Sequence, residues 1–295
     1  MVLDRGTIVN SIVHFPLDMT FFTTSDLLEL HGIPFNSRAI KPDRREAIRY
    51  YQNLVNYFGI PVTTGADVLA IQGTLEWFDI TFRKEAAEQV LQARKIIIAS
   101  GFFDQPNLLN VPGEKLPHVS HYYREPFAHF HEKVAVVGGK NSAVEAALEL
   151  HRHGAEVTLI HRKSEIRESV KYWVLPDIKN RIAEGKIQVR LKTTVEKIRR
   201  GWIEINQDGR KEKLAADAVY LLTGYHPDVS LLENSGIRYD ADTLEPEIDP
   251  HTLESSVSGI YLAGSLIAGR NSNRIFIENS RDHGEKILSD VENKL

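Results

Sequence analysis

Hydrophobic and polar positions near the middle of the chain predict a strand, a turn, a helix and a second strand. Residues 134–137 form an unbroken, β-branched apolar run, which is typical of a strand buried on both faces. Residues 138–139 are both glycine, and residues 143–151 are rich in Ala, Leu and Glu, as a helix should be. Gly154 suits the end of that helix, and residues 157–160 predict another buried strand. This order within about thirty residues predicts a dinucleotide-binding βαβ unit.

The turn of this unit has the residues of an anion site. Unpaired amides at a helix N-terminus, together with the helix dipole, hold a pyrophosphate. Gly138 matches the first glycine of the pattern G-x-G-x-x-G/A and Ala143 matches its last position, whereas Lys140 replaces the middle glycine. A helix start that binds no phosphate is the alternative interpretation, and the complete βαβ context favours nucleotide binding.

The residues after the second strand predict which nucleotide binds. An Asp or Glu at that position would bind the ribose 2′-hydroxyl of NAD. The chain instead has His161, Arg162 and Lys163, followed by Arg167. Fixed cations without an acid favour a 2′-phosphate, so we expect NADP(H) rather than NAD(H). A solvated basic turn is the alternative.

Periodicity elsewhere predicts one clear amphipathic helix among many short strands. Asp43 is the expected N-cap of a helix over residues 42–58, where apolar residues recur at three- and four-residue spacing. Asp208 and Gly209 predict a hairpin turn. Further helices are expected at residues 173–182, beginning at Pro176, and at residues 276–295, interrupted near Gly284. Short strands are expected at residues 1–4, 62, 68–71, 77–82, 93–99, 189–198, 202–205, 213–215 and 259–263.

Two apolar runs end in small residues. Residues 96–101 (IIIASG) end in Ser100 and Gly101, and residues 218–224 (AVYLLTG) end in Gly224. Small residues at the carboxyl end of a strand let a ligand lie against the backbone. Each run alone fits a tight turn after a core strand equally well, but two copies on either side of the βαβ unit favour ligand contact.

Composition excludes several classes of function. The net charge of −4 is not the excess of positive charge that is typical of proteins that bind nucleic acid or an anionic membrane. No apolar run reaches transmembrane length, and the first residues lack a signal-peptide pattern, so we expect a soluble, cytoplasmic protein. The 295 residues include no cysteine, which excludes a thiolate nucleophile, a disulfide or a thiolate metal site among them. Four histidines in the Pro- and aromatic-rich stretch 107–131 lack supporting ligands at metal-site spacing, and we expect no metal.

With these elements placed, the chain resembles the thioredoxin-reductase-like flavoprotein disulfide reductases, and within them the bacillithiol-disulfide reductases of YpdA type. The stretch GGKNSA is typical of that subgroup, which also lacks the middle glycine. The resemblance rests on the stretches VLDRGTIVNSIVHFPLDMTFFTTSDLLEL, KPDRREAIRYYQ, VVGGKNSAVEAALEL, YLLTGYHPD and GIYLAGSLIAGRNSNRIFIENSRDHG.

The resemblance implies an α/β fold with two Rossmann-like dinucleotide-binding domains, each in three layers. Residues 1–113 and 243–295 would form the FAD-binding domain, and residues 114–242 the inserted NADPH-binding domain. It also implies an enzyme that passes hydride from NADPH through FAD to a low-molecular-weight disulfide resembling bacillithiol disulfide. We expect a homo-oligomer.

Individual cofactor residues follow from the same resemblance, which assigns no catalytic residue here. Asp4 matches the acid that binds the FAD ribose, and Gly264 matches the glycine of the late Gly-Asp motif beside the ribityl chain. Ser265 replaces the acid of that motif. The pyrophosphate turn for NADPH matches Gly138, Gly139, Asn141, Ser142 and Ala143. The positions of the 2′-phosphate match Arg162, Lys163 and Arg167.

One part of the family pattern has no counterpart in this sequence. The family begins with a strand, a glycine-rich turn and a helix that hold the FAD pyrophosphate, and in the bacillithiol subgroup this turn carries a cysteine that acts on the substrate. Here the resemblance starts at the second strand, so it implies an FAD domain lacking its first strand and helix. The activity of the chain as given is correspondingly in doubt.

Two other functions remain open from the sequence. A flavin-dependent monooxygenase would also use NADPH, and the stretch PGEKLPHVSHYY weakly resembles a motif of that group. A flavin-free NADPH-binding remnant is the second alternative.

We expect the chain as given to hold little or no FAD, to be poorly soluble and to expose apolar surface. In the family, the amides that hold the FAD pyrophosphate precede the position of Asp4. The absorbance spectrum of the purified chain tests this, because bound FAD is yellow. Adding a strand, a G-x-G-x-x-G turn and a helix upstream should give a yellow, soluble protein. A chain that is already folded and stoichiometric in FAD would show the expectation to be wrong.

Overall fold

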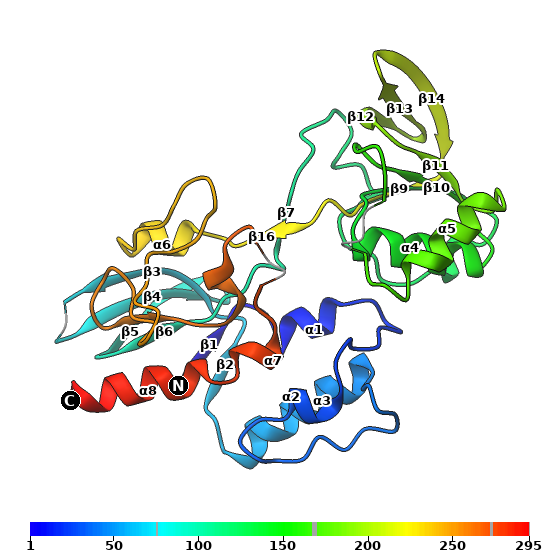
Figure 1. The fold of residues 1–295 in the computed structure, drawn as a ribbon. Helices are drawn as coiled ribbons and strands as arrows, with labels where there is room; N and C mark the ends of the chain where they lie inside the picture. Colours follow the sequence, from blue (N-terminus) through cyan, green and yellow to red (C-terminus); the bar gives the residue numbers. More distant parts are fainter. Residues whose placement is uncertain (75, 167–169, 272–273, 295) are drawn as a thin grey trace. The chain divides into compact units, whose positions relative to one another are not determined.

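The chain divides into two compact units (Figure 1). The computed structural model describes residues 1–74, 76–166, 170–271 and 274–294. The first unit comprises Met1–Val13, Asp18–Gln105 and Tyr225–Leu295, and the second comprises His14–Leu17 and Pro106–Gly224. These boundaries differ from the predicted domains, because residues 14–17 and 106–113 belong to the second unit and residues 225–242 to the first.

The second unit is built on a parallel sheet with strand order β11-β10-β9-β15-β8. Its elements are β8 (Val119–Ser120), η1 (Phe127–His129), β9 (Lys133–Val137), α4 (Asn141–Arg152), β10 (Glu156–Ile160), α5 (Leu175–Ala183), β11 (Gln188–Arg190), β12 (Thr193–Arg199), β13 (Gly201–Gln207), β14 (Arg210–Ala216) and β15 (Ala218–Leu221). The crossover from β9 through α4 to β10 is the βαβ unit that the sequence predicted.

Alternation along β9 explains the layers of this unit. Val134 and Val136 are buried in the cluster that contains the apolar faces of α4 and α5. Ala135 and Val137 point to the opposite face, where they are buried with Ile203 and other residues of the antiparallel sheet β12-β13-β14. Because successive side chains of a strand point to opposite faces, a strand covered on both sides must be apolar throughout. The predicted three-layer α/β architecture is confirmed for this unit (Figure 1).

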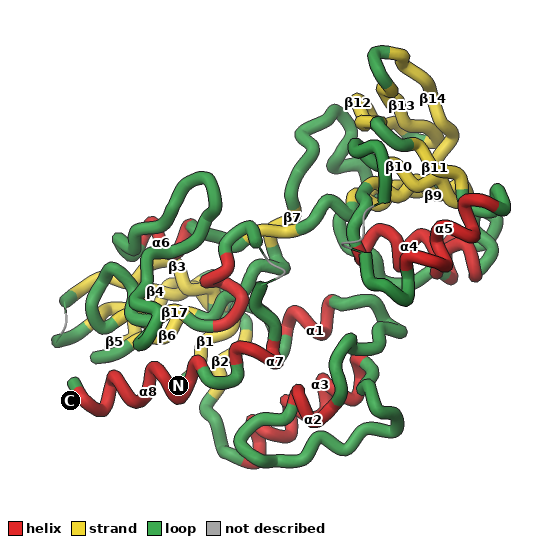
Figure 2. The backbone as a smooth tube through the Cα atoms, in the orientation of Figure 1, coloured by secondary structure: helices red, strands yellow, loops and turns green. Residues whose placement is uncertain are grey.

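The first unit contains short parallel strand pairs and an antiparallel meander (Figure 2). β1 runs parallel to β2, β6 runs parallel to β17, and β3, β4 and β5 form the meander. Its elements are β1 (Val2–Asp4), α1 (Asn10–His14), α2 (Ser25–Leu28), α3 (Arg44–Tyr57), β2 (Val62–Thr64), β3 (Asp67–Gly73), β4 (Phe78–Lys84), β5 (Ala87–Ala93), β6 (Ile96–Ile98), β7 (Gln105–Pro106), β16 (Tyr225–His226), α6 (Ser230–Asn234), β17 (Ile260–Leu262), η2 (Gly264–Ala268), α7 (Ile277–Ser280) and α8 (His283–Asn293).

The apolar run at residues 96–101, which predicts a buried core strand, forms β6 at residues 96–98 but is not buried at its central isoleucine. Ile98 is buried in the core and Ile96 packs against it, but Ile97 is 50% exposed. Only one face of β6 packs against the core. Because successive side chains of a strand point to opposite faces, the Ile97 side chain points away from that core. A run of three isoleucines therefore did not distinguish a one-sided strand from a two-sided one.

Several element boundaries differ from the prediction for local reasons. The apolar stretch after Gly6 forms the short helix α1, and residues 87–93 form β5, which the sequence analysis did not assign. The expected strand over 189–198 is divided into β11 and β12, and Lys192 lies between them with φ +50°. The last helix is divided into α7 and α8. Among the described residues, no helix is both long enough and apolar enough to cross a bilayer.

The N-terminus of α3 forms the cap that the sequence predicted. The Asp43 side chain accepts a hydrogen bond from the Glu46 amide at 2.8 Å, and the Glu46 carboxylate accepts one from the Asp43 amide at 2.9 Å. This reciprocal capping box satisfies two amides that the helix itself cannot pair. The backbone hydrogen bond holds the pKa of Asp43 below its ordinary value.

We predict that Asp43→Ala lowers the free energy of unfolding by about 1 kcal/mol, the usual cost of a lost cap. Since the pKa of Asp43 is lowered in the folded state, this contribution is present at neutral pH and is lost as the pH falls through that pKa. Chemical denaturation at neutral and acidic pH measures both effects. Thr24→Ala is the matched control, because Thr24 precedes α2 without a side-chain cap hydrogen bond. Equal losses in the two variants would contradict the assigned cap.

Candidate cofactor sites

The turn after β9 leaves no room for a side chain. Gly138 has φ +154°, and its amide donates a hydrogen bond to the Ile160 carbonyl at 2.9 Å. A Cβ built on Gly138 would lie 2.5 Å from the Leu222 carbonyl oxygen and 2.7 Å from the Cβ of Ala143. Both distances are too short for any side chain, so glycine is required here by packing against β15 and α4 as well as by any ligand.

Gly139 is restricted by a different neighbour. A Cβ at Gly139 would lie 2.3 Å from both Nδ1 and Cε1 of His161. The imidazole of His161 therefore covers this part of the turn. The backbone of His161 is fixed by a hydrogen bond from its amide to the Arg190 carbonyl at 2.8 Å. The residue that directly follows β10 thus packs on the turn that follows β9.

The start of α4 presents amides that the helix does not use. The Val144 amide makes the first helical hydrogen bond, to the Lys140 carbonyl at 3.1 Å, so the amides of residues 141–143 precede the helical ladder. Lys140 stands at the N-cap without a side-chain cap hydrogen bond. Ser142 is exposed, whereas Ala143 is fully buried beneath the turn. These amides, with the positive end of the helix dipole, suit an anionic group.

Asn141 has a role that the sequence did not reveal. Its Oδ1 accepts a hydrogen bond from the Lys171 amide at 2.9 Å. The ammonium of Lys171 in turn pairs with the carboxylate of Glu145 on the next turn of α4. Asn141 and Glu145 thereby attach the segment around Lys171 to the first turns of the helix.

The predicted cations follow β10 as expected. Arg162 and Lys163 are both exposed directly after the strand, at the carboxyl edge of the sheet. The carbonyl of Lys163 accepts from the Lys192 amide at 2.9 Å, which fixes the backbone of this segment. Arg167, the third predicted cation, lies outside the described residues.

The second small-residue strand end, at Gly224, lies at the same edge. β15 and β9 are neighbours in register, with Leu221 beside Val137. Gly224 has φ +94°, and its carbonyl accepts from the Asn107 amide at 2.9 Å. The Thr223 hydroxyl donates to the Asn107 carbonyl at 2.6 Å. Asn107 therefore positions this strand end, and nothing in the sequence pattern identified it.

A buried carboxylate orders the loop that carries Asn107. Glu114 accepts from the amides of Leu109 at 2.8 Å and Asn110 at 2.7 Å. Its oxygen also lies 3.3 Å from Nε2 of His121, whose pKa is lowered by burial against the opposing effect of the Glu114 charge. Within the described ranges, no group of three or more His, Asp or Glu side chains is arranged to hold a metal ion.

In the first unit, Asp4 ends β1 as the sequence predicted. β1 runs parallel to β2, with Asp4 opposite Thr64. The carboxylate of Asp4 accepts a hydrogen bond from the Gly6 amide at 2.7 Å. The neighbouring Arg5 is engaged with Asp104 at 2.7 Å. The half-buried Asp4 carboxylate has a fixed orientation at the end of a strand, as a group that binds a ribose hydroxyl requires.

The ends of β6 and β17 bring Gly101, Gly264 and Ser265 together. Gly101 and Gly264 have φ +71° and φ +68°, and a Cβ on Gly101 would lie 3.6 Å from Oγ of Ser265. A Cβ on Gly264 would meet no described atom within 4 Å, so the backbone there is open to a flat group. Ser100 is exposed beside Gly101. These features fit a flavin beside the two strand ends.

His283 is a buried residue of this corner that the sequence analysis missed. Its Nδ1 accepts a hydrogen bond from the Gly264 amide at 3.1 Å. Burial lowers the pKa of His283, which keeps the ring neutral and its acceptor nitrogen available. The sequence shows only a histidine within a helix, and nothing in that pattern indicates contact with the end of β17.

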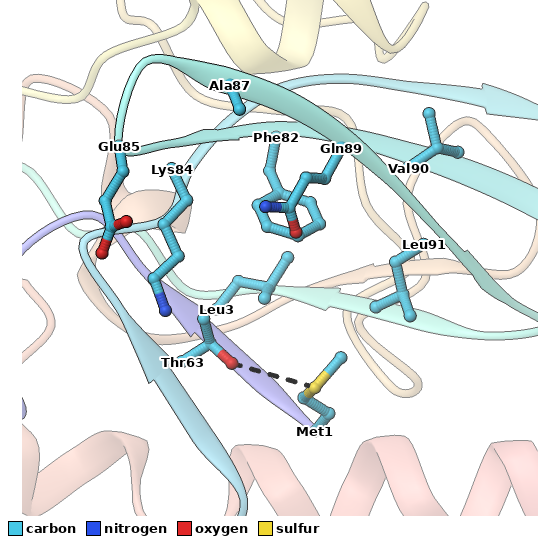
Figure 3. A pocket seen from close by; sticks show the side chains of 10 residues that line it. All are labelled: Met1, Leu3, Thr63, Phe82, Lys84, Glu85, Ala87, Gln89, Val90 and Leu91. Atoms are coloured by element: carbon cyan, nitrogen blue, oxygen red, sulfur yellow. Dashed lines mark hydrogen bonds between the residues drawn. The ribbon is translucent and has the colours of Figure 1, made fainter.

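A cavity of about 590 Å³ lies elsewhere in the first unit (Figure 3). Figure 3 shows Leu3, Phe82 and Leu91 directed toward it from β1, β4 and β5. None of its lining residues is among those predicted to bind a cofactor. They are Met1, Leu3, Thr63, Phe82, Lys84, Glu85, Ala87, Gln89, Val90 and Leu91.

Comparison with known proteins gives consistent matches over almost the whole chain. Residues 1–264 match the family described as pyridine nucleotide-disulphide oxidoreductase. The chain is 38% identical over 293 residues to the bacilliredoxin reductase Bdr of Bacillus subtilis (strain 168), covering 99% of this chain and 89% of that protein. The bacillithiol disulfide reductase Bdr (YpdA) of Bacillus cereus has a similar structure, with a TM-score of 0.97 at 36% identity, covering 100% of this chain and 91% of that one.

A more distant structure shows the fold alone. The thioredoxin reductase of T. acidophilum superposes with a TM-score of 0.75 at 19% identity, covering 99% of this chain and 89% of that chain. The two-domain, thioredoxin-reductase-like α/β fold expected from the sequence is thereby confirmed.

We predict that Gly139→Ala weakens NADPH binding and destabilises the second unit, because the new methyl group would overlap the His161 ring. Replacing His161 with Ala should relieve the overlap, so the double variant should be more stable than Gly139→Ala alone. Thermal unfolding of the two single variants and the double variant measures this coupling. Additive effects would show that the contact between Gly139 and His161 does not limit the turn.

Proposed function

The chain belongs to the pyridine nucleotide-disulphide oxidoreductase family, and we propose that it is an NADPH-dependent FAD enzyme that reduces a low-molecular-weight disulfide. The observation that carries this proposal is the turn after β9. There Gly138 and Gly139 leave no room for a side chain. The first amides of α4 precede the first hydrogen bond within the helix, and exposed cations follow β10. The redox class itself follows from membership of the family.

The residues of the second unit would bind and orient NADPH. The amides of residues 141–143 would donate to the pyrophosphate, at the positive end of the α4 dipole. Arg162 and Lys163 would pair with the 2′-phosphate, and Arg167 would be the third cation. Gly224, held by Asn107, would leave space for the nucleotide at the end of β15.

The residues of the first unit would bind FAD, which when bound supplies a two-electron carrier between NADPH and the disulfide. Asp4 would accept hydrogen bonds from the ribose hydroxyls. Gly101 and Gly264 would let the flavin approach the backbone, and Ser265 can donate or accept a hydrogen bond without adding charge. His283 would keep the Gly264 amide in place.

We further infer that the substrate resembles bacillithiol disulfide. Support comes from the relatives, which are named as bacilliredoxin and bacillithiol disulfide reductases. In the overall reaction, one NADPH and one proton reduce one disulfide to two thiols. The 295 residues contain no cysteine, so no mixed disulfide with the substrate can form on them. We place this reaction in the cytoplasm, where thiols are kept reduced, and expect a homo-oligomer.

The monooxygenase alternative has less support, because relatives that share more than a third of the residues are named as disulfide or bacilliredoxin reductases. A flavin-free nucleotide-binding protein remains the competing proposal. The absorbance spectrum of the purified chain with added FAD separates it from a flavoprotein.

The reaction itself is tested by following NADPH under anaerobic conditions, with FAD in excess and bacillithiol disulfide added in known amounts. We expect NADPH to be consumed in proportion to the disulfide. NADPH consumption that requires dioxygen and does not depend on the amount of disulfide would favour a monooxygenase. A chain that binds FAD and NADPH but consumes no NADPH would contradict the proposed reaction.

We predict that Arg162→Ala weakens NADPH binding about tenfold, since a charge-assisted contact contributes about 1.5 kcal/mol or more. NADH binding should change little, because NADH lacks the 2′-phosphate. Arg162→Ala combined with Arg167→Ala should enlarge the difference. Isothermal calorimetry with both nucleotides measures it.

Lys186→Ala is the control for this prediction. Lys186 is also exposed, but it precedes β11 and so lies at the amino edge of the parallel sheet, away from the predicted site. It should leave both affinities unchanged. Equal losses for NADPH and NADH in Arg162→Ala would contradict the assignment of the 2′-phosphate.

A further inference from the structure

Two large aromatic residues are exposed just before α5, in the segment that Lys171 attaches to the first residue of α4. Tyr172 and Trp173 are 82% and 47% exposed, and their rings meet edge to face at 4.8 Å between centroids. Exposed aromatic pairs are uncommon on a surface without a binding role, because each ring leaves a large apolar area in water. The proposed function so far uses neither residue.

The backbone fixes this pair beside the nucleotide turn. The Lys171 amide donates to Oδ1 of Asn141, the first residue of α4, and the Val174 amide donates to the Lys171 carbonyl at 2.9 Å. Residues 171–174 therefore form a turn whose base is attached to the helix N-terminus. Tyr172 and Trp173 occupy the tip of this turn.

A second contact holds the Trp173 ring in the same place. The Lys171 ammonium lies 5.9 Å from the centre of the Trp173 ring and also pairs with Glu145, one turn into α4. Lys171 is itself nearly buried, so this cation links the ring to the helix rather than to solvent. The Lys171 ammonium therefore connects the indole to α4, through a cation–π contact with the Trp173 ring and an ion pair with Glu145.

We propose that Tyr172 and Trp173 form an aromatic platform that stacks on a base ring of the bound dinucleotide, an inference that rests on the proposed nucleotide site. The amides of residues 141–143 would hold the pyrophosphate, and the platform begins at Tyr172, the residue after Lys171, whose amide donates to Asn141. A planar heterocyclic ring that a ribose links to this pyrophosphate is the group that two exposed aromatic rings at this position suit. Adenine and nicotinamide share this chemistry.

The test compares NADPH affinities of the full chain and three variants by calorimetry. Trp173→Ala and Tyr172→Ala should each weaken binding by at least about fivefold, the low end of the range for stacking a base on an aromatic ring. Trp173→Phe keeps a ring and should retain most of the affinity. Trp77→Ala removes another exposed tryptophan, which lies in the first unit, and should leave the affinity unchanged.

Fluorescence supplies a readout that a purely structural role would not give. The chain has three tryptophans, so replacing Trp77 and Trp202 with Phe leaves Trp173 as the reporter. NADPH should quench it. Repeating the affinity series with adenosine 2′,5′-bisphosphate and with nicotinamide mononucleotide identifies the stacked ring, because only the ligand that carries this ring should bind more weakly to Trp173→Ala.

The outcomes separate this inference from the proposed function. If NADPH binds the unmodified chain and Trp173→Ala binds it equally well, the platform is wrong and the nucleotide site stands. If neither partial ligand distinguishes Trp173→Ala from the unmodified chain, stacking is likewise excluded. If NADPH does not bind the unmodified chain, both the platform and the proposed function are wrong.

Discussion

The structure depends most on the close approach of backbone at the turn between β9 and α4. Gly138 packs against the Leu222 carbonyl and the Ala143 methyl group, and Gly139 packs beneath the His161 ring. These contacts bring the carboxyl ends of β9, β10 and β15 to one edge, where the helix amides also begin. A side chain at either glycine would overlap protein atoms and push these elements apart, whether or not a ligand is bound. The same packing that closes the sheet therefore places the unused amides of α4 at the edge where we propose that the phosphate binds.

Support for this edge comes from polar groups that are far apart in sequence. Asn107 holds the strand end at Thr223 and Gly224 with its backbone and with its side-chain amide, which donates to the Thr223 carbonyl at 3.3 Å. Glu114 orders the loop that presents Asn107. In the first unit, His283 performs a comparable role for Gly264. In each case a polar side chain satisfies or fixes backbone groups that would otherwise be costly to bury unpaired. The predicted cofactor residues are thus held in place by residues that would not themselves touch the cofactor.

The sequence predicted the parts of the fold that local chemistry determines. The apolar run of β9, the glycine turn, the cap at Asp43 and the hairpin at Asp208 each depend on residues within a few positions of one another. It did not predict the support given by Asn107, Glu114 and His283, because their partners are determined by tertiary packing. It also did not show that the Asn141 side chain is directed to Lys171. The exposure of Ile97 was missed because burial of the alternate face depends on elements distant in sequence.

Most of the proposed function depends on one inference, that the nucleotide phosphate binds at the turn after β9. The most direct measurement is a backbone amide NMR spectrum of the chain recorded during titration with NADPH. We expect the largest chemical-shift changes at the amides of residues 139–143, accompanied by changes at residues 161–163. Saturation by NADPH that leaves these amides unshifted would contradict it.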